Sequence, residues 1–217
     1  MLMDFMQSLH TSTKRDYVAR MRDDKVICMM VAREFEREYW DGDRRYGYGG
    51  YWYKEGRWTG VAKALIERYG LKAGSSVLDL GCGKGYLLYE LQQLEPGLVL
   101  HGMDRSQYAV AHRHPKFRGE ITCGRIENTA FAGRYDLVIS LGALHNLTLR
   151  DLSLALPMIQ KAGKNAYIMV ESFRDEQELF NLQCWCLTAE TLIRPEDWEY
   201  LFKLHGYTGD HEFIYFT

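Results

Sequence analysis

The sequence lacks any hydrophobic run long enough to cross a lipid bilayer. Its longest apolar stretches, such as residues 137–144, fall far short of the roughly 20 residues that a membrane-spanning helix needs. The first residues contain no charged stretch followed by an apolar core, so we expect no secretory leader. We therefore expect a cytoplasmic protein without a membrane partner.

The sequence also lacks the paired cysteine spacing of zinc sites. The cysteines are Cys28, Cys82, Cys123, Cys184 and Cys186. Their number is odd and no C-x-x-C pair occurs, which favours reduced thiols in a cytosolic protein. The histidines are scattered, and the pair His112-x-His114 has no carboxylate or thiol ligand nearby, so we predict no metal site.

An excess of charge of either sign is missing as well. The net charge is −2, and basic and acidic residues are interspersed along the 217 residues. Without a basic stripe, we expect no nucleic-acid partner. The length suits one α/β domain, and an apolar content of 47% allows a sizeable core.

From residue 57 onward, the hydrophobic pattern alternates between strands and helices. The predicted strands are residues 76–80, 98–103, 119–123, 135–141 and 165–171, and the chain ends in an extended run at 212–216. The predicted helices are residues 58–69, 84–94, 106–113, 149–161 and 195–205. Thr148 and Asp151 form a predicted capping box for the helix at 149–161. Pro157 lies inside that helix and should kink or shorten it.

This alternation predicts a Rossmann-like α/β fold, with a mostly parallel sheet and helices on both faces. Residues 1–40 show helical spacing, and residues 46–53 are rich in glycine and tyrosine. We therefore divide the chain into an N-terminal helical segment with an aromatic lid at 1–56 and a ligand-binding domain at 57–217.

Three alternating glycines occupy the turn between the first strand and the next helix, in residues 81–85. Glycine lets the backbone turn sharply and approach a ligand, and the N–H groups that open a helix attract polar or anionic groups. The pattern is G-x-G-x-G rather than the G-x-G-x-x-G of dinucleotide folds, which counts against NAD. A glycine-rich turn that binds NAD, or nothing, is the alternative.

Two acids strengthen the ligand interpretation. Asp79 lies two residues before the first glycine, and Asp104 ends the next strand. Ligands of parallel sheets bind beyond the carboxyl ends of the strands, where a carboxylate can accept hydrogen bonds from both hydroxyls of a ribose. Two further strand ends follow, in residues 122–128 and 135–141.

This ordered set of strand ends resembles the class I S-adenosylmethionine-dependent methyltransferases over roughly residues 58–171. The resemblance implies that the glycine loop passes the methionine moiety, that the second-strand acid holds the ribose, and that the third-strand loop frames the adenine. The residues implied for the cofactor are Asp79, Gly81, Cys82, Gly83 and Gly85 at the methionyl end, Asp104, Arg105 and Ser106 at the ribose, Arg125, Ile126 and Glu127 around the adenine, and Leu141 closing the site.

The sequence departs from this family at two places. Many relatives carry Asp at the position of Arg125 and use it on the adenine amino group, so Glu127 or a backbone carbonyl must serve here. Only one clear strand follows the last predicted helix, whereas the family usually ends in an antiparallel pair. The resemblance therefore does not predict the edge of the sheet.

Outside the cofactor motifs, residues 41–50, 171–185 and 206–210 resemble a group of small stand-alone bacterial methyltransferases. That resemblance implies a small polar acceptor, either sugar-like or amino-acid-like. The polar and aromatic residues at 177–185 are expected to cover the pocket.

Two strand ends supply candidates for chemistry on the acceptor. His145 follows the fourth strand and can remove a proton from a hydroxyl or amine, unless it packs on the cofactor or caps the helix near Thr148. Glu171 follows the fifth strand and can hold an acceptor hydroxyl or amine. Asn146 and Arg174 are assigned to acceptor binding, although Arg174 can equally form an internal Glu–Arg pair.

The tyrosine-rich segment at 46–53 is a predicted lid. Aromatic faces exclude water and attract a sulfonium or another cation, although surface packing is the alternative. We assign Tyr51 to catalysis and Tyr46, Tyr48 and Tyr53 to acceptor binding.

The sequence thus predicts an enzyme that uses S-adenosylmethionine to methylate an oxygen or nitrogen of a small polar metabolite. Two alternatives keep the same fold and cofactor: a non-methylation reaction such as cyclisation, and a non-catalytic binding module. The acceptor's identity and the oligomeric state are not predicted.

Overall fold

The computed structural model describes residues 1–129 and 135–217, which are built around one six-stranded sheet. The strands are β1 (Ser76–Leu80), β2 (Val99–Asp104), β3 (Glu120–Cys123), β4 (Tyr135–Leu141), β5 (Gly163–Glu171) and β6 (Asp210–Ile214). Their order is β3-β2-β1-β4-β5-β6, and every neighbouring pair is parallel. The predicted Rossmann-like α/β class is confirmed.

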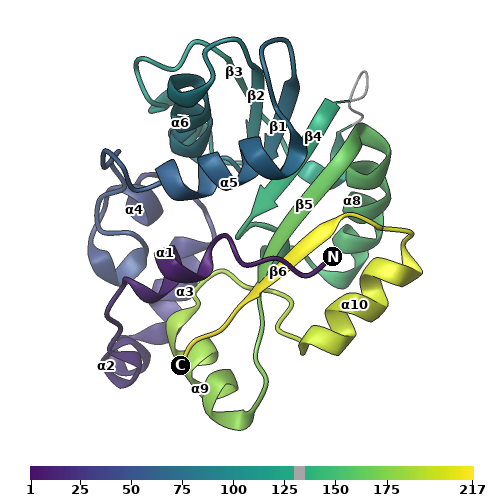
Figure 1. The fold of residues 1–217 in the computed structure, drawn as a ribbon. Helices are drawn as coiled ribbons and strands as arrows, with labels where there is room; N and C mark the ends of the chain where they lie inside the picture. The colour runs from purple at the N-terminus through teal and green to yellow at the C-terminus, as the bar shows by residue number, and fades with distance from the viewer. Residues whose placement is uncertain (130–134) are drawn as a thin grey trace.

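Helices cover both faces of this sheet (Figure 1). The longer ones are α5 (Thr59–Tyr69), α6 (Tyr86–Leu94), α8 (Leu149–Ala162), α9 (Glu176–Trp185) and α10 (Pro195–Leu204), and the shorter ones are α1 (Gln7–Thr11), α2 (Tyr17–Arg22), α3 (Lys25–Ala32), α4 (Arg37–Trp40) and α7 (Gln107–Ala111). Single 3-10 turns lie at η1 (Arg44–Tyr46), η2 (Ile126–Asn128) and η3 (Leu144–Asn146).

Alternation along each strand divides the core into two layers. On β1, Val77 packs with Leu65 of α5 and Leu88 of α6, whereas the next residue, Leu78, packs with Leu156 of α8 on the opposite face. Successive strand side chains point to opposite faces, so a strand that is covered on both sides must be apolar at every position. The acid Asp79 interrupts this run only at the end of the strand, where the ligand side begins.

Local signals place several helix ends as predicted. Gly70 ends α5 in the left-handed conformation with φ of 60°, and the Thr148 hydroxyl accepts a hydrogen bond from the Asp151 N–H at the start of α8. The expectation that Pro157 shortens α8 is wrong, because the helix continues to Ala162. Its buried face, which includes Leu152 and Ile159, packs against the sheet and offsets the lost backbone hydrogen bond.

The last sheet edge, which the family resemblance did not predict, is formed by one strand and the start of the chain. β6 runs parallel to β5, and Leu2 forms a parallel bridge with His211 on the outer side of β6. The buried Glu212 carboxylate accepts hydrogen bonds from the N–H groups of Phe5 (2.7 Å) and Met6 (2.9 Å). The first residues of the chain are therefore tied to the sheet (Figure 1).

The N-terminal helices α1 to α4 gather with α9 at one end of the sheet (Figure 1). The sequence predicted a helical N-terminal region, but it gave residues 176–185 only as a polar and aromatic covering. These residues form α9, which begins where the Asp175 carboxylate accepts a hydrogen bond from the Glu178 N–H. A cap of this kind was present in the sequence as Asp followed three residues later by Glu.

Candidate active site

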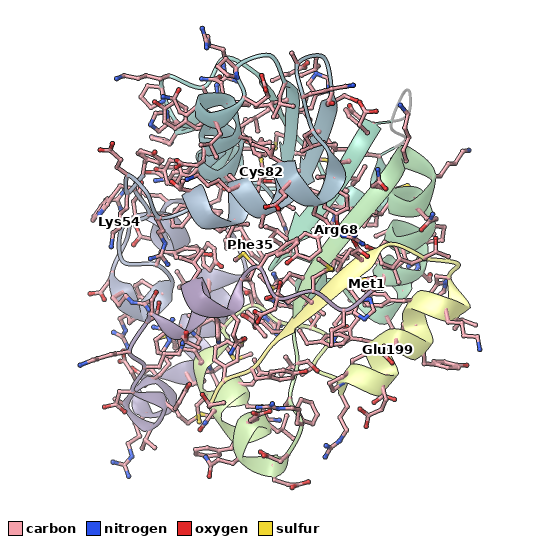
Figure 2. The ribbon with its side chains drawn as sticks, viewed as in Figure 1. Met1, Phe35, Lys54, Arg68, Cys82 and Glu199 are labelled. Carbon is pink, nitrogen blue, oxygen red and sulfur yellow. The ribbon has the colours of Figure 1, made fainter. Side chains whose placement is uncertain are left out.

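A cavity of about 510 Å³ lies beyond the carboxyl ends of the central strands. Its floor includes Asp79, Asp104 and Glu171 at the ends of β1, β2 and β5. Its walls come from the N-terminal segment and from residues 185–188, and its size falls within the range of about 300–1,000 Å³ for small-molecule sites. In Figure 2 Phe35 is labelled beside the N-terminal helices and Cys82 near α5 and the strands; both residues line the cavity.

The glycine loop forms a tight part of the floor. Gly81 and Gly83 have φ of 85° and 54°, in the left-handed region that disfavours other residues. A Cβ on Gly81 would lie 2.4 Å from the Ala143 Cβ, and one on Gly83 would lie 2.9 Å from the Trp40 ring. The loop therefore requires glycine both for its path and for the close approach of its neighbours.

Asp104 is held firmly at the end of β2. Its carboxylate accepts hydrogen bonds from the N–H groups of Gly83 (2.7 Å) and Ser106 (2.9 Å), one on each oxygen. Burial raises the pKa of this carboxyl, while these two N–H groups lower it. Each oxygen keeps a further lone pair, so the group can still accept hydrogen bonds from a ligand.

Asp79 has the opposite surroundings. Its carboxyl is buried, lines the cavity and makes no hydrogen bond within the described part of the chain. Burial, followed by the nearby Asp104 charge, raises its pKa to about 8. A buried acid without a partner is costly unless a ligand supplies a hydrogen-bond donor or a cation.

The loop after β3 completes this acidic part of the cavity. Ile126 and Glu127 are buried in the lining, and the Arg125 guanidinium donates to the Glu127 carboxylate. Leu141 lines the cavity at the end of β4. S-adenosylmethionine presents an ammonium, a sulfonium, ribose hydroxyls and an adenine amine. These groups match the unpaired Asp79 and the acceptor oxygens of Asp104 and Glu127.

His145, Glu171 and Cys186 meet on the other side of the cavity. The buried His145 accepts a hydrogen bond at Nδ1 from the Glu171 N–H (3.3 Å), and its Nε2 lies 3.4 Å from Glu171 Oε2. The Cys186 thiol donates to the same Oε2 at 2.6 Å. Both contacts fix one carboxylate oxygen and leave Oε1 without a protein partner among the described residues.

The tyrosine segment contributes two of its predicted members to the lining. Tyr48 and Tyr51 line the cavity, with ring centroids 4.4 Å apart, and Trp40 stacks on Tyr48 at 5.3 Å. Burial raises the pKa of Tyr51 well above its ordinary value, so its hydroxyl stays protonated near neutral pH. Arg105 and Asn146 also line the cavity.

Five predicted site residues lie outside the lining: Gly85, Ser106, Tyr46, Tyr53 and Arg174. Gly85 begins α6, and the Ser106 hydroxyl caps α7 by accepting from the Ala109 N–H. Tyr53 donates to the Glu90 carboxylate at 2.7 Å, and Tyr46 packs beside α3. Arg174 pairs with Glu178, which is the alternative that the sequence left open.

Sequence reasoning missed the contacts that join the N-terminal segment to the glycine loop. The buried Lys84 ammonium donates to both oxygens of Asp41 at 2.7 Å and to the Tyr51 carbonyl at 2.8 Å. The Trp40 indole N–H donates to the Ser106 hydroxyl at 3.0 Å. A lysine between two loop glycines was the available signal, because lysine is seldom buried without a specific partner.

Neither a membrane-spanning helix nor a cluster of metal-ligating side chains is found within residues 1–129 and 135–217. No helix in those ranges is long and apolar enough to cross a membrane. No group of three or more metal-ligating side chains occurs there either.

Comparisons with known proteins agree with this geometry. A family model described as a methyltransferase domain matches residues 71–206. The chain is 30% identical over 114 residues to ribosomal RNA small subunit methyltransferase C of Buchnera aphidicola, covering 49% of this chain and 32% of that one. It is 37% identical over 82 residues to trans-aconitate 2-methyltransferase of Mycobacterium tuberculosis, covering 37% and 31%. The chain thus spans about a third of the length of these curated relatives.

Solved structures share the fold at low sequence identity. One is the complex between the Haloferax volcanii Trm112 methyltransferase activator and a putative methyltransferase, with 22% identity, a TM-score of 0.56 and coverage of 67% of this chain and 66% of that one. Another is the YcgJ protein of Bacillus subtilis, with 15% identity, a TM-score of 0.54 and coverage of 66% of each chain. These similarities concern the fold alone.

Proposed function

Since this chain belongs to the class I S-adenosylmethionine-dependent methyltransferases, we propose that it methylates an oxygen or nitrogen of a small polar metabolite. The observation that carries the proposal is one cavity, walled by the N-terminal segment, whose lining includes Asp79, Asp104 and Glu171. Walls on several sides suit a small acceptor better than a polymer. The free state of all five cysteines supports a cytoplasmic location.

S-adenosylmethionine supplies, when bound, an electrophilic methyl group on a sulfonium. The acidic residues of the cavity would bind this cofactor: Asp104 would hold the ribose, Glu127 the adenine amine and Asp79 the positively charged methionyl end. Tyr48 and Tyr51 exclude water and present aromatic faces, which favour a nearby cation. Methyl transfer is an in-line displacement, so fixed positions and a dry site supply much of the rate.

We propose that Glu171 meets the acceptor atom and takes its proton. Its Oε2 is held by Cys186 and faces His145, so Oε1 is the oxygen available to the cavity. His145 accepts a backbone N–H at one ring nitrogen and faces Glu171 with the other. This arrangement supports His145 in positioning Glu171 rather than in contacting the acceptor directly.

Transfer of an isotope-labelled methyl group tests the proposed acceptor class. The enzyme is incubated with S-adenosylmethionine carrying a labelled methyl group and, separately, with a cellular small-molecule fraction or a ribosomal RNA fraction. We expect labelled product in the small-molecule fraction, and a loss of at least tenfold in rate for Glu171→Gln. The RNA arm is included because one curated relative is named a ribosomal RNA methyltransferase; label confined to RNA would contradict the proposal.

A further inference from the structure

Three arginines from the N-terminal segment converge on one indole ring at the cavity wall. The guanidinium carbons of Arg15, Arg20 and Arg44 lie 5.4, 5.3 and 5.1 Å from the centroid of Trp185. All four side chains line the cavity. Three like charges are thus gathered around one aromatic face, an arrangement that costs energy unless an anion offsets it.

No carboxylate within the described residues forms an ion pair with any of these three arginines. Arg15 donates to the carbonyls of residues 10 and 13, Arg20 to the Arg44 carbonyl, and Arg44 to the Gly47 carbonyl. The buried Nε atoms of Arg15 and Arg20 have no hydrogen-bond partner. Burial lowers the pKa of both groups; the Arg44 charge lowers the pKa of Arg20 further, whereas Tyr17 and Glu171 raise the pKa of Arg15. Arg15 Nη2 also contacts His10 Nδ1 at 3.2 Å, whereas the Nη2 groups of Arg20 and Arg44 have no hydrogen-bond partner among the described residues and keep donors for a ligand.

The position of this arginine group relates it to the acceptor rather than to the cofactor. Trp185 precedes Cys186, whose thiol contacts Glu171, so the arginines adjoin the proposed reaction centre. Asp79 and Asp104 belong to the acidic part of the floor. The cavity lining thus combines an acidic group from the strand ends with a basic group from the N-terminal segment.

We propose that Arg15, Arg20 and Arg44 form an oxyanion subsite, so that the methyl acceptor is a small metabolite bearing a carboxylate or phosphate group. This inference rests on the proposed function, because it names the acceptor class of the same site. Guanidinium groups bind carboxylate and phosphate through paired N–H donors, and the contact with the Trp185 ring holds these three close together.

The same charges orient such an acceptor. The arginines attract its anionic group, while the Glu171 carboxylate repels it. A hydroxyl or amine elsewhere on the acceptor is thereby directed to Glu171 Oε1. A nucleic acid fits less well, because the basic groups line a cavity instead of forming an exposed stripe on a chain of net charge −2.

Calorimetric titration of simple anions tests the subsite without knowledge of the acceptor. Citrate and inorganic phosphate, the probes for the two oxyanion chemistries, are titrated into the protein saturated with S-adenosylhomocysteine. We expect at least one of them to bind, and to bind at least tenfold more weakly to Arg20→Gln and Arg44→Gln. Arg22→Gln is the matched control, since Arg22 lies on the same helix α2, is exposed and lies outside the cavity lining. Arg20→Lys keeps the charge and should retain part of the affinity.

Two measurements distinguish loss of the anion subsite from misfolding of the variants and from a failure of methyl transfer. Affinity for S-adenosylhomocysteine should be the same in the arginine variants as in the parent protein, which shows that the cavity is intact. Anion binding needs no turnover, so it can succeed even if methyl transfer to a small molecule is not observed. The inference is overturned if neither anion binds, if the variants bind them as the parent does, or if a short RNA alone shows arginine-dependent binding.

Discussion

Asp79 and Asp104 are carboxylates at neighbouring strand ends with different tasks. Asp104 is satisfied by two backbone N–H groups before any ligand arrives, whereas Asp79 has no hydrogen-bond partner in the described structure. A preorganised acceptor suits hydroxyl recognition, because its position is fixed in advance. An unpaired acid instead favours a positively charged ligand, whose binding removes the cost of burial.

Replacement of Asp104 by alanine should weaken S-adenosylmethionine binding by tenfold or more. The change removes the proposed ribose acceptor and leaves the N–H groups of Gly83 and Ser106 without their partner, and hydrogen bonds to charged groups contribute about 1.5–3 kcal/mol each. Isothermal titration measures the affinity, with Asp197→Asn on α10 as a control that should bind normally. Unchanged affinity in Asp104→Ala would contradict the ribose assignment.

Asp79→Asn should stabilise the unliganded protein at high pH while weakening cofactor binding. The pKa of Asp79 is about 8 in the folded protein against an ordinary value of 3.8. Its contribution to the free energy of unfolding is therefore fully present below pH 4, and it is lost as the pH rises through 8. The slope approaches about 1.4 kcal/mol per pH unit, so the variant should be about 2 kcal/mol or more stable than the parent at pH 8.5.

Chemical denaturation of the unliganded protein between pH 5 and pH 9 measures this difference. If the free energies of unfolding of the parent and the variant change in parallel over that range, the pKa of Asp79 is not raised in the folded protein.

At the scale of elements, the sequence predicted those parts whose local signals agree with their tertiary surroundings. Strand ends, the glycine turn and the Thr148 cap were recognisable because apolar periodicity and capping residues coincide there. The helix α8 runs past Pro157 to Ala162, one residue beyond its predicted end, and its packing against the sheet offsets the effect of the proline. The helix α9 was missed because it mixes polar and aromatic residues and has little apolar periodicity.

The residues of the site likewise fall into those that the sequence predicted and those that it did not. Asp79, Asp104 and Glu171 were identifiable because strand ends of a parallel sheet share one edge. The partners of Lys84, and the convergence of three arginines on Trp185, join segments far apart in the chain. Sequence spacing contains no information on such contacts.

The contact between Lys84 and Asp41 should hold the N-terminal segment against the glycine loop. Lys84→Met removes the ion-pair partner of Asp41, which keeps hydrogen bonds from the Tyr51 N–H and the Tyr108 hydroxyl, and breaking a buried pair costs about 3 kcal/mol. We expect this loss in the free energy of unfolding, together with weaker cofactor binding because Trp40 and Tyr51 lose their support. Urea denaturation and calorimetry are the measurements, and Lys63→Met on the exposed side of α5 is the control. Normal cofactor affinity in Lys84→Met would separate the segment from the cofactor site.

At the scale of the molecule, the small net charge conceals a separation of charge inside the cavity. Asp79, Asp104 and Glu127 come from two strand ends and the turn after β3, whereas Arg15, Arg20 and Arg44 come from the N-terminal segment, and all six line the cavity. The N-terminal segment supplies the whole basic group and is also tied to the edge of β6. The division of the chain at residue 56 stays a prediction.

The central claim is that one cavity binds the cofactor through its acidic group and the acceptor through its basic group. Its most direct test is calorimetric titration of S-adenosylhomocysteine into four variants: Asp104→Asn, Glu127→Gln, Arg20→Gln and Arg44→Gln. The account predicts that affinity falls in the two acid variants and is unchanged in the two arginine variants. Equal losses in all four, or losses in the arginine variants alone, would contradict it.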